Sequence, residues 1–590
     1  MPPSNLGFVP LPLPRCLIQD PVAGGWRAFR APRETVIAQR LEEVLPALRE
    51  IERRVERERL WAAGFLAYEA GPAFDRAVRA RPAGALPLLW FGLYDEPSLV
   101  PLPPRDPAAA RPVYRWTASV DRAHYDGAIA RIRELIAAGD TYQVNYTLRL
   151  RAPAEEPPEA LFLRMVQANE PRYSAWLDCG RFVVCSASPE LFLRRDGERL
   201  ESRPMKGTTG RGLWAAQDEA RAQALARSPK NRAENVMIVD MVRNDLGRIS
   251  EIGSVRVPSL FELERYPTLW QMTSTVTARS SAPFAEVLCA SFPPASITGA
   301  PKGRTTEIIA ELETTPRGVY TGAIGYIAPG RRAQFNVAIR TALFDREQAT
   351  VEYGVGGGIV WDSTSQAEYE ECLLKARIVT DAPPEFSMLE TMLWEPEGGY
   401  FLLDEHLRRL TESSGYLGAR VDVWRVRAHL AELAKGFGRQ RQRLRLVVSR
   451  DGEISSSASA LDEPARPVRL AIAAAPLDPA NPFLYNKTTY RRMYDEAKAS
   501  RPGCDDVVLW NDRGEVTETT IANLVVELGG RKLTPPVECG LLPGVFRGWL
   551  LARGEIAEAR ITLDDLRRAS RVWTINSVRK WRDAVLVKGD

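Results

Sequence analysis

The chain has 590 residues, of which 45% are hydrophobic and 26% charged, and its formal net charge is +4. This length predicts two large domains or three to four small ones, and the composition is that of a soluble globular protein. So small a net charge gives no support to nucleic-acid binding. The first residues contain no basic segment followed by an apolar run, and no apolar stretch is long enough to span a bilayer. We therefore expect a cytoplasmic protein that does not bind membranes.

Cysteines and histidines are few and scattered. The seven cysteines form no CxxC pair, so their spacing predicts neither a zinc cluster nor a disulfide framework. Only three histidines are present, which argues against a histidine-rich metal site or a Ser-His-Asp triad. The chemistry is expected to depend on carboxylates, lysines or a cofactor.

Helices and strands alternate along the first two thirds of the chain. Residues 121–140, DRAHYDGAIARIRELIAAGD, carry an apolar stripe that predicts an amphipathic helix ending at Gly139. The next stretch, TYQVNYTLRL, alternates with period two, which predicts a strand with Val144 and Tyr146 on one face and Gln143 on the other. The mixture indicates an α/β class of the α+β type.

A strand, a turn and a second strand are predicted before Lys206. Residues 182–203 have two apolar runs, a Ser-Pro break before Glu190, and a hairpin signal at Asp196 and Gly197. Lys206 follows this sheet region in the stretch PMKGTTG. From these residues alone, an exposed loop lysine remains the alternative to a functional one.

Acidic residues occur in a segment that looks buried. NRAENVMIVDMVRNDLGRI is apolar almost all the way round, which predicts a buried helix, yet it contains Glu234, Asp240 and Asp245. Buried carboxylates need hydrogen-bond donors, a cation or a metal. Helix caps or paired arginines would satisfy them without a ligand.

A second acidic group lies on a later helix. In SQAEYEECLLKARIV, Glu368, Glu371 and Lys375 share one helical face. Glu371 and Lys375 would form an ordinary surface pair, or Glu371 would converge with Glu234 on one Mg²⁺, which prefers oxygen ligands. Spacing leaves both interpretations open.

Weak anion-binding signals lie between the two acidic helices. Lys302 is expected at the start of a helix, Gly322 and Gly325 in a turn between apolar strands, and Arg340 on the polar side of a strand.

Taken in chain order, these motifs resemble those of the chorismate-utilising enzymes. The matching stretches are GDTYQVNYT, SPELF, PMKGT, NRAENVMIVDMVRNDLG, SITGAPK, GVYTGAIGYI, NVAIRTA and EYEECLLKAR. The family includes anthranilate, isochorismate, salicylate and aminodeoxychorismate synthases. The resemblance implies one large domain, residues 1–380, with an antiparallel β-sandwich and a site in its central cleft.

The resemblance also implies a metal and a general acid. Glu234 and Glu371 match the magnesium ligands, and the metal would hold the ring carboxylate of chorismate. Glu190 matches the general acid that protonates the departing ring hydroxyl, a task suited to a buried carboxyl group with a raised pKa.

Further motif positions imply the binding of the substrate. Tyr320, Arg340 and the turn containing Gly322 and Gly325 resemble the groups that bind the other carboxylate of chorismate. Thr298 of the SITGAPK motif is assigned to the same substrate site.

Two positions imply which subgroup of the chorismate-utilising enzymes the chain resembles. Members that add water carry a lysine where this chain has Gln143, which favours ammonia as the nucleophile. Aminodeoxychorismate synthases have lysine at the position of Lys206, whereas anthranilate synthases have alanine, so Lys206 resembles the amine that attacks ring carbon 2. The chain departs from the family pattern just afterwards, with Gly210 and Arg211 in place of Pro-Arg.

The remaining residues, 387–590, follow a predicted linker at 381–386 and resemble the fold-type IV pyridoxal-phosphate enzymes. The stretches NKTTY, VTETT, LPGVFR and NSVR carry this resemblance. From spacing alone Lys487 looks structural, but by resemblance it is the Schiff-base lysine, and Glu518 the carboxylate at the pyridine nitrogen. The implied phosphate site consists of Arg409, Gly544, Val545 and Ser577. The strands that usually open this domain, before LETML, are missing.

The two resemblances together imply a bifunctional enzyme of p-aminobenzoate synthesis that requires Mg²⁺ and pyridoxal 5′-phosphate. The second domain is then a 4-amino-4-deoxychorismate lyase, because the product of the first is its substrate. No glutamine amidotransferase segment is recognised, so ammonia is expected from a separate glutaminase subunit. The alternatives are an anthranilate synthase with an appended aminotransferase, or a non-catalytic C-terminal module that forms a homodimer or docks a partner.

Overall fold

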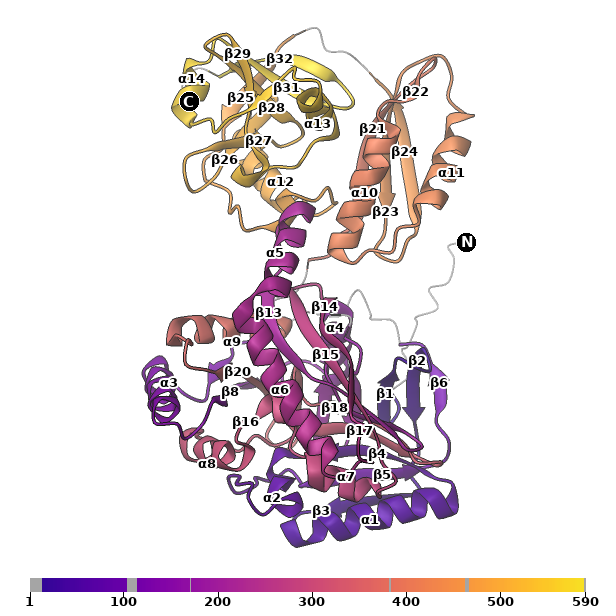
Figure 1. The fold of residues 1–590 in the computed structure, drawn as a ribbon. Helices are drawn as coiled ribbons and strands as arrows, with labels where there is room; N and C mark the ends of the chain where they lie inside the picture. The colour runs from indigo at the N-terminus through magenta and orange to yellow at the C-terminus, as the bar shows by residue number, and fades with distance from the viewer. Residues whose placement is uncertain (1–12, 103–113, 170, 381–383, 462–465, 588–590) are drawn as a thin grey trace. The chain divides into compact units, whose positions relative to one another are not determined.

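The protein forms two compact units in the computed structural model (Figure 1). The described residues are 13–102, 114–169, 171–380, 384–461 and 466–587. Unit 1 comprises Met1–Gly210 and Ala222–Pro383, and unit 2 comprises Arg211–Arg221 and Pro384–Asp590. Unit 2 therefore includes a short segment that the sequence-based division places in the first domain. Residues 381–383 of the predicted linker lie outside the described residues.

Unit 1 contains two antiparallel sheets. The first has the spatial order β16 (Gly299–Ala300), β8 (Gln143–Pro153), β20 (Thr350–Ile359), β19 (Thr341–Asp345), β10 (Phe182–Ser186), β9 (Ala175–Asp178), β1 (Cys16–Asp20), β2 (Gly25–Phe29) and β6 (Ser98–Val100), and β7 (Thr117–Ala118) pairs with β8. The second has the order β13 (Met205–Gly210), β15 (Leu269–Arg279), β12 (Arg199–Arg203), β11 (Leu191–Asp196), β18 (Arg332–Val337), β17 (Ala323–Ala328), β4 (Trp61–Leu66), β5 (Leu89–Tyr94) and β3 (Glu34–Ala38), and β14 (Arg256–Arg265) pairs with β15.

The two sheets pack face to face. Ile18 and Phe29 of the first sheet share one buried cluster with Phe65 and Ile324 of the second. Side chains alternate across each strand, so the inner residues of both sheets build a common core. The predicted antiparallel β-sandwich is confirmed.

Helices cover the other faces of the two sheets. They are α1 (Leu41–Glu58), α2 (Gly71–Phe74), α3 (Arg122–Ala137), α4 (Pro158–Asn169), α6 (Pro229–Gly247), α7 (Phe284–Ser291), α8 (Lys302–Leu312) and α9 (Ser365–Thr380), and α5 (Ala215–Arg227) begins in the segment assigned to unit 2. Residues of α1 and α7 pack in one buried cluster with the second sheet, and residues of α3, α4 and α9 in another with the first.

The predicted helix and strand before residue 153 are confirmed. Asp121 caps α3 by accepting a hydrogen bond from the His124 amide at 2.8 Å, and Ile129 and Ile132 of its stripe are buried. Gly139 has a φ of +81°, which ends the helix. The alternating stretch then forms β8, so local periodicity was sufficient to predict both elements.

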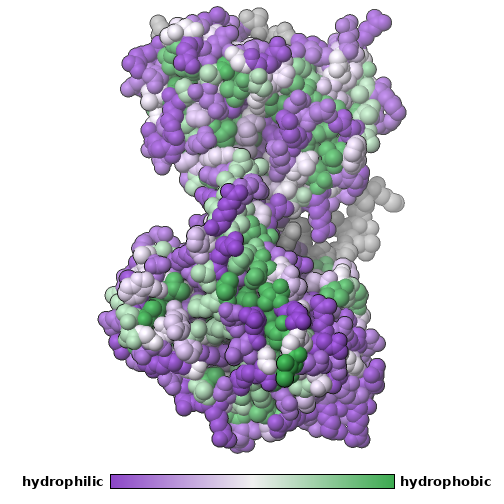
Figure 2. Space-filling view, in the orientation of Figure 1, coloured by the Kyte–Doolittle hydropathy of each residue, from purple (hydrophilic) through white to green (hydrophobic). Residues whose placement is uncertain are grey.

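Helix α6 is less buried than its sequence predicts. Ile238, Val239 and Val242 pack inwards, but Val236 is 39% exposed, and Figure 2 shows hydrophobic residues over this helix and the neighbouring strands. The prediction of a helix buried all round is wrong because α6 packs against the sheet on one side only.

Two of the three carboxylates in α6 have ordinary cationic partners. Asp240 forms an ion pair with Arg243 at 2.6 Å on the exposed side, and Asp245 pairs with Lys302 at 2.8 Å. Ion pairing therefore accounts for both carboxylates without a ligand.

Unit 2 contains a small sheet and a larger one. The small sheet has the order β22 (Gly399–Tyr400), β21 (Met388–Glu395), β23 (Gln442–Val448) and β24 (Ile454–Ala460), and its core includes residues of α10 (Leu403–Leu417) and α11 (Val423–Ala434). The larger sheet has the order β27 (Val516–Thr519), β26 (Asp506–Trp510), β25 (Val468–Ile472), β32 (Lys580–Leu586), β31 (Arg571–Asn576), β28 (Asn523–Leu528), β29 (Arg531–Thr534) and β30 (Ala557–Glu558). Helices α12 (Arg492–Ala499), α13 (Val545–Ala552) and α14 (Leu563–Arg568) complete the unit.

Strand β21 joins the two parts of unit 2 near Lys487. The Leu389 amide donates to the Lys487 carbonyl at 3.0 Å, and Met388 forms a β-bridge with Thr488. None of the helices in the described ranges has the length and apolar character that crossing a membrane requires.

Candidate active sites

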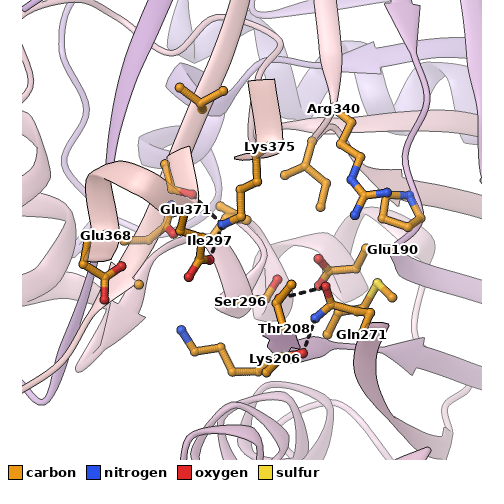
Figure 3. Close-up of a pocket in the computed structure, with 18 of the residues that line it drawn as sticks. Glu190, Lys206, Thr208, Gln271, Ser296, Ile297, Arg340, Glu368, Glu371 and Lys375 are labelled. Carbon is orange, nitrogen blue, oxygen red and sulfur yellow. Dashed lines mark hydrogen bonds and ion pairs between the residues drawn. The ribbon is translucent and has the colours of Figure 1, made fainter. Parts of the chain in front are cut away.

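Unit 1 encloses a polar cavity of about 180 Å³ (Figure 3). Many of the residues singled out in the sequence line it although they come from distant parts of the chain. These are Glu190, Lys206, Glu234, Tyr320, Arg340, Glu368, Glu371 and Lys375.

Lys206 lies on β13 and reaches the cavity. Its side chain is only 15% exposed, and its Nζ is 3.3 Å from the Glu234 carboxylate. A bulge between Met205 and Thr208, with Gly207 at a φ of +100°, locally changes the direction of the strand. Across the cavity, a Cβ built on Gly358 would lie 2.4 Å from Lys206 Nζ, so only glycine leaves room for the amine at its present position.

Glu190 precedes β11 and is 3% exposed. Burial raises the pKa of its carboxyl group to about 7, although hydrogen bonds from Ser296 and the Met205 amide favour the charged form. Near neutral pH this group is thus partly protonated and can deliver a proton, as a general acid must.

Three further glutamates line the cavity besides Glu190. Glu371 on α9 is paired with Lys375 at 2.7 Å, and this lysine lowers the pKa of Glu371. Burial raises the pKa of the neighbouring Glu368. Glu234 on α6 is held by Lys206, so each predicted metal ligand has a lysine as its cationic partner.

The donor set is compatible with magnesium. In the described part of the chain, no group of three or more histidine, cysteine, aspartate or glutamate side chains is placed to hold a metal. Glu234 and Glu371 nevertheless line one cavity, and Mg²⁺ usually takes one or two carboxylates and completes its shell with water and a substrate anion. The two carboxylates are thus of the kind that would suit the ion implied by the family resemblance.

Arg340 supplies an anion-binding group. It is 8% exposed, its guanidinium stacks over Tyr266 at 5.2 Å, and its Nη1 has no hydrogen-bond partner. Burial lowers the pKa of Arg340. Buried donors are normally paired, so an unpaired guanidinium nitrogen at a cavity wall indicates a site for an anion such as a carboxylate.

Tyr320 lies on the same wall. The Arg149 guanidinium stacks over its ring at 5.0 Å, and burial raises the pKa of its hydroxyl. A Cβ at Gly354 would lie 2.3 Å from the ring, so this glycine of β20 permits its position.

The other predicted substrate residues do not line the cavity. Gln143 is fully buried, its amide oxygen and nitrogen have no hydrogen-bond partner, and a Cβ built on Gly358 would lie 3.2 Å from its amide group. The Thr298 hydroxyl is close to the Pro294 and Ala295 carbonyls, at 3.3 and 3.1 Å.

Gly322 and Gly325 also lie outside the cavity lining. Gly322 immediately precedes β17, but Gly325 lies inside this strand and pairs with Phe335 on one side and Gly64 on the other. The predicted turn is therefore wrong at Gly325. The position is glycine because a Cβ would lie 1.9 Å from the Gln334 carbonyl oxygen.

Sequence reasoning missed Gln271 and Ser296. Gln271 on β15 donates to the Gly207 carbonyl at 2.9 Å and accepts from Thr208, so it supports the bulge that carries Lys206. Sheet pairing brings Gln271 there, and no signal in its own neighbourhood could have revealed it. Ser296 lies in a stretch already singled out, but its contact with Glu190 depends on the fold.

Unit 2 contains a larger cavity of about 390 Å³ around Lys487. Burial and the nearby Arg409 lower the pKa of Lys487 to about 8. An amine with this pKa is largely desolvated and partly neutral near physiological pH, which suits a lysine that forms an imine.

Glu518 lies on β27 and lines the same cavity. It accepts hydrogen bonds from the Tyr494 hydroxyl at 2.9 Å, the Leu542 amide at 3.2 Å and the Asn523 amide at 3.1 Å. Burial nevertheless raises its pKa to about 8. A cationic group placed against it would favour the carboxylate form.

The remaining residues predicted to bind the cofactor line this cavity too. They are Arg409 on α10, Gly544 and Val545 at the start of α13, and Ser577. Amides at a helix start attract anions such as phosphate. Gly544 is restricted to glycine, because a Cβ would lie 1.9 Å from the Asn523 amide oxygen.

Glu390 organises the cationic side of the cavity. It accepts from Arg409 Nε at 2.9 Å and lies 2.8 Å from His406 Nδ1. His406 is 1% exposed, and its Nε2 has no partner although the residue lines the cavity. Arg409 and the first amides of α13 are donors that suit a phosphate, so the residues are compatible with pyridoxal phosphate.

Comparison with known proteins agrees with this geometry. Residues 13–381 match the chorismate binding enzyme family, which is more than half of the chain. The chain belongs to this family. Residues 387–587 match the amino-transferase class IV family. This chorismate-binding enzyme thus carries a class IV aminotransferase-like domain after its chorismate-binding domain.

Several curated relatives of the first domain are named for chorismate chemistry. Aminodeoxychorismate synthase component 1 of Salmonella typhimurium is 37% identical over 341 residues, which cover 52% of this chain and 74% of the relative. Anthranilate synthase component 1 1 of Haloarcula marismortui is 39% identical over 282 residues, covering 48% and 57%.

Coverage of other relatives is smaller. Aminodeoxychorismate synthase of Streptomyces pristinaespiralis is 44% identical over 264 residues, but the match spans only 36% of its length and 43% of this chain.

Among solved structures, anthranilate synthase component I of Streptococcus pneumoniae has a TM-score of 0.52 and 23% identity over 64% of this chain and 95% of its own. This likeness shows a common fold.

Proposed function

We propose that the chorismate-binding enzyme makes p-aminobenzoate in two steps. Unit 1 converts chorismate and ammonia to 4-amino-4-deoxychorismate, and unit 2 eliminates pyruvate from that product. The observation that carries the proposal is Lys206, a lysine amine that shares one cavity with the acid Glu190 and the anion-binding Arg340.

In unit 1, the arrangement supports addition of the Lys206 amine to ring carbon 2. As the bond forms, the ring double bonds shift and the hydroxyl at carbon 4 departs, taking its proton from Glu190. Ammonia then adds at carbon 4 and expels the lysine. Arg340 would hold a carboxylate of the substrate during both displacements.

Glu234 and Glu371 would hold Mg²⁺. When bound, the ion would supply positive charge to the ring carboxylate and to the developing negative charge. Lys206 and Lys375 occupy these carboxylates in the structure, so release of Lys206 from Glu234 would free its amine for attack.

In unit 2, Lys487 would bind the cofactor and Glu518 would face its pyridine nitrogen. When bound, pyridoxal phosphate supplies an electron sink. Once the substrate amine has displaced it, the freed Lys487 would take the proton from carbon 4 of the substrate. Return of a proton to the departing enolpyruvyl group would release pyruvate and leave an aromatic ring. Arg409 and the first amides of α13 would bind the phosphate.

We also propose that ammonia comes from a separate glutaminase subunit. Relatives of the first domain are named component 1, which supports a second component. The purified chain is expected to use ammonium salts but not glutamine. Activity with glutamine as the sole nitrogen source would overturn this part of the proposal.

Replacement of Lys206 by alanine is the direct test of the first step. The K206A variant should form no 4-amino-4-deoxychorismate from chorismate, ammonia and Mg²⁺, as measured by chromatography of the reaction mixture. Unchanged formation would refute the proposed step. Anthranilate as the wild-type product would instead favour the activity for which the Haloarcula relative is named.

The second step has an independent test. The wild-type chain should take up pyridoxal phosphate, acquire visible absorbance, and release pyruvate from purified 4-amino-4-deoxychorismate. A colourless protein that binds no cofactor would favour a non-catalytic C-terminal module.

A further inference from the structure

The cavity of unit 2 has arginines on two walls. On one wall, Arg443 and Arg445 of β23 flank Leu444, which is fully buried in the core shared with α10 and α11. Because side chains alternate along a strand, both arginines project from the opposite face of the sheet, and both line the cavity.

The other wall carries Arg579 and Arg582, near the turn between β31 and β32. Burial lowers the pKa of Arg582, and repulsion from Arg579 and Arg466 adds to this effect, whereas the Asp505 carboxylate opposes it. Crowding of like charges in a partly buried position is unfavourable, and an anionic ligand beside Arg582 would relieve it.

The carboxylates that line the cavity already have partners within the protein. Asp506 accepts from the Thr520 hydroxyl, Asp505 pairs with Arg466 at 2.8 Å, and Glu518 is held by its three donors. Within the described ranges, neither Arg443 nor Arg445 forms an ion pair with an acidic side chain. The charges of Arg443 and Arg445 are therefore available to an anion that enters the cavity.

We propose that Arg443, Arg445 and Arg582 bind the two carboxylates of the substrate of unit 2, one at each wall, and so select a dicarboxylate. This inference rests on the proposed lyase function. A substrate that presents its amine to Lys487 and carries carboxylates on both the ring and the side chain would match two separated cationic walls. An ordinary amino acid, with one carboxylate next to its amine, would leave one wall without a partner.

The test uses the full chain loaded with pyridoxal phosphate. In the R443Q/R445Q variant, KM for 4-amino-4-deoxychorismate should rise at least about tenfold, or about 1.4 kcal/mol of binding, with a smaller change in kcat. Cofactor absorbance should stay as in the wild type. R425Q on α11 is the matched control, because Arg425 is exposed and does not line the cavity.

Inhibition gives a second readout. Isophthalate, an aromatic dicarboxylate, should inhibit the wild-type lyase more strongly than benzoate, and the difference should disappear in R443Q/R445Q. If that variant does not fold, R582Q on the other wall provides the same comparison.

The possible failures are distinguishable. A cofactor-loaded wild-type chain that releases no pyruvate from 4-amino-4-deoxychorismate would overturn the lyase function and this inference together. An active wild type whose KM and inhibitor preference are unchanged in R443Q/R445Q and R582Q would overturn the arginine assignment alone.

Discussion

Each unit places a lysine and a buried glutamate in one cavity, but the two lysines are controlled differently. Lys206 in unit 1 lies 3.3 Å from Glu234, a carboxylate that is also a predicted metal ligand. Lys487 in unit 2 forms no ion pair with an acidic residue of the described chain, and burial with Arg409 lowers its pKa to about 8. Under the proposed function, Lys206 would be released by exchange of its ionic partner, whereas Lys487 would be made reactive by desolvation.

Removing each lysine separately should have the largest effect, and each removal should affect one reaction only. K206A should lose formation of 4-amino-4-deoxychorismate, and K487A should lose pyruvate release, each on the order of a thousandfold or more. K487A should accumulate the intermediate, as measured by chromatography. Adding K206A protein to that mixture should restore p-aminobenzoate, because its unit 2 is intact. Release of p-aminobenzoate by K487A alone would show that Lys487 is not required.

Replacement of Glu190 should have the next largest effect. E190Q should lower the synthase rate by about a hundredfold to ten-thousandfold, without changing the lyase rate. Since the pKa of Glu190 is about 7 and the acid form is needed, wild-type synthase kcat/KM should fall as the pH rises above 7. A pH profile that keeps the same decline in E190Q would assign the proton to another group.

Loss of Glu390 should destabilise unit 2 selectively. Burial acts to raise the pKa of Glu390, but Arg409 and His406 outweigh it and lower the value from 4.5 to about 2. This stabilisation is present above the unfolded pKa near 4.5 and is lost as the pH falls through about 2. E390Q should lower the unfolding free energy of unit 2 by about 3 kcal/mol at pH 7.

Calorimetry and cofactor titration would measure this change. The affinity for pyridoxal phosphate should also weaken in E390Q, because Arg409 loses its anchor. The difference in stability between E390Q and the wild type should narrow below pH 4. A unit 2 transition that is unchanged at pH 7 would contradict the proposed role of Glu390.

The smallest effect concerns two glycines of unit 1. G358A places a Cβ 2.4 Å from Lys206 Nζ and 3.2 Å from the Gln143 amide carbon, so the synthase rate should fall on the order of tenfold to a hundredfold. G127A on the exposed side of α3, where nothing lies within 4 Å, should leave the rate unchanged. It should stabilise unit 1 by about 0.5–1 kcal/mol. Equal rates in both variants would mean that the Lys206 amine tolerates displacement.

Sequence reasoning was most successful where the signal was local. The stripe around Ile129 and the alternation around Val144 predicted α3 and β8 because periodicity reports which side of an element is buried. The same reasoning failed for α6, where apolar residues such as Val236 remain exposed, and for Gly325, whose strand neighbours Gly64 and Phe335 are remote in the chain. A hydrophobic pattern shows which residues of an element are apolar, but not on how many of its sides other elements pack.

The sequence by itself determined the family, the two-domain order and the residue types available for chemistry, because motifs such as PMKGT and NKTTY are contiguous. Only the tertiary structure decided that Lys206 meets Glu234, that Ser296 reaches Glu190, and that Arg443 faces the same cavity as Arg582. The physical reason is the separation along the chain between the residues on which each property depends. Periodicity and turns depend on neighbours along the chain, whereas burial, ion pairing and pKa depend on groups that folding brings together from distant positions.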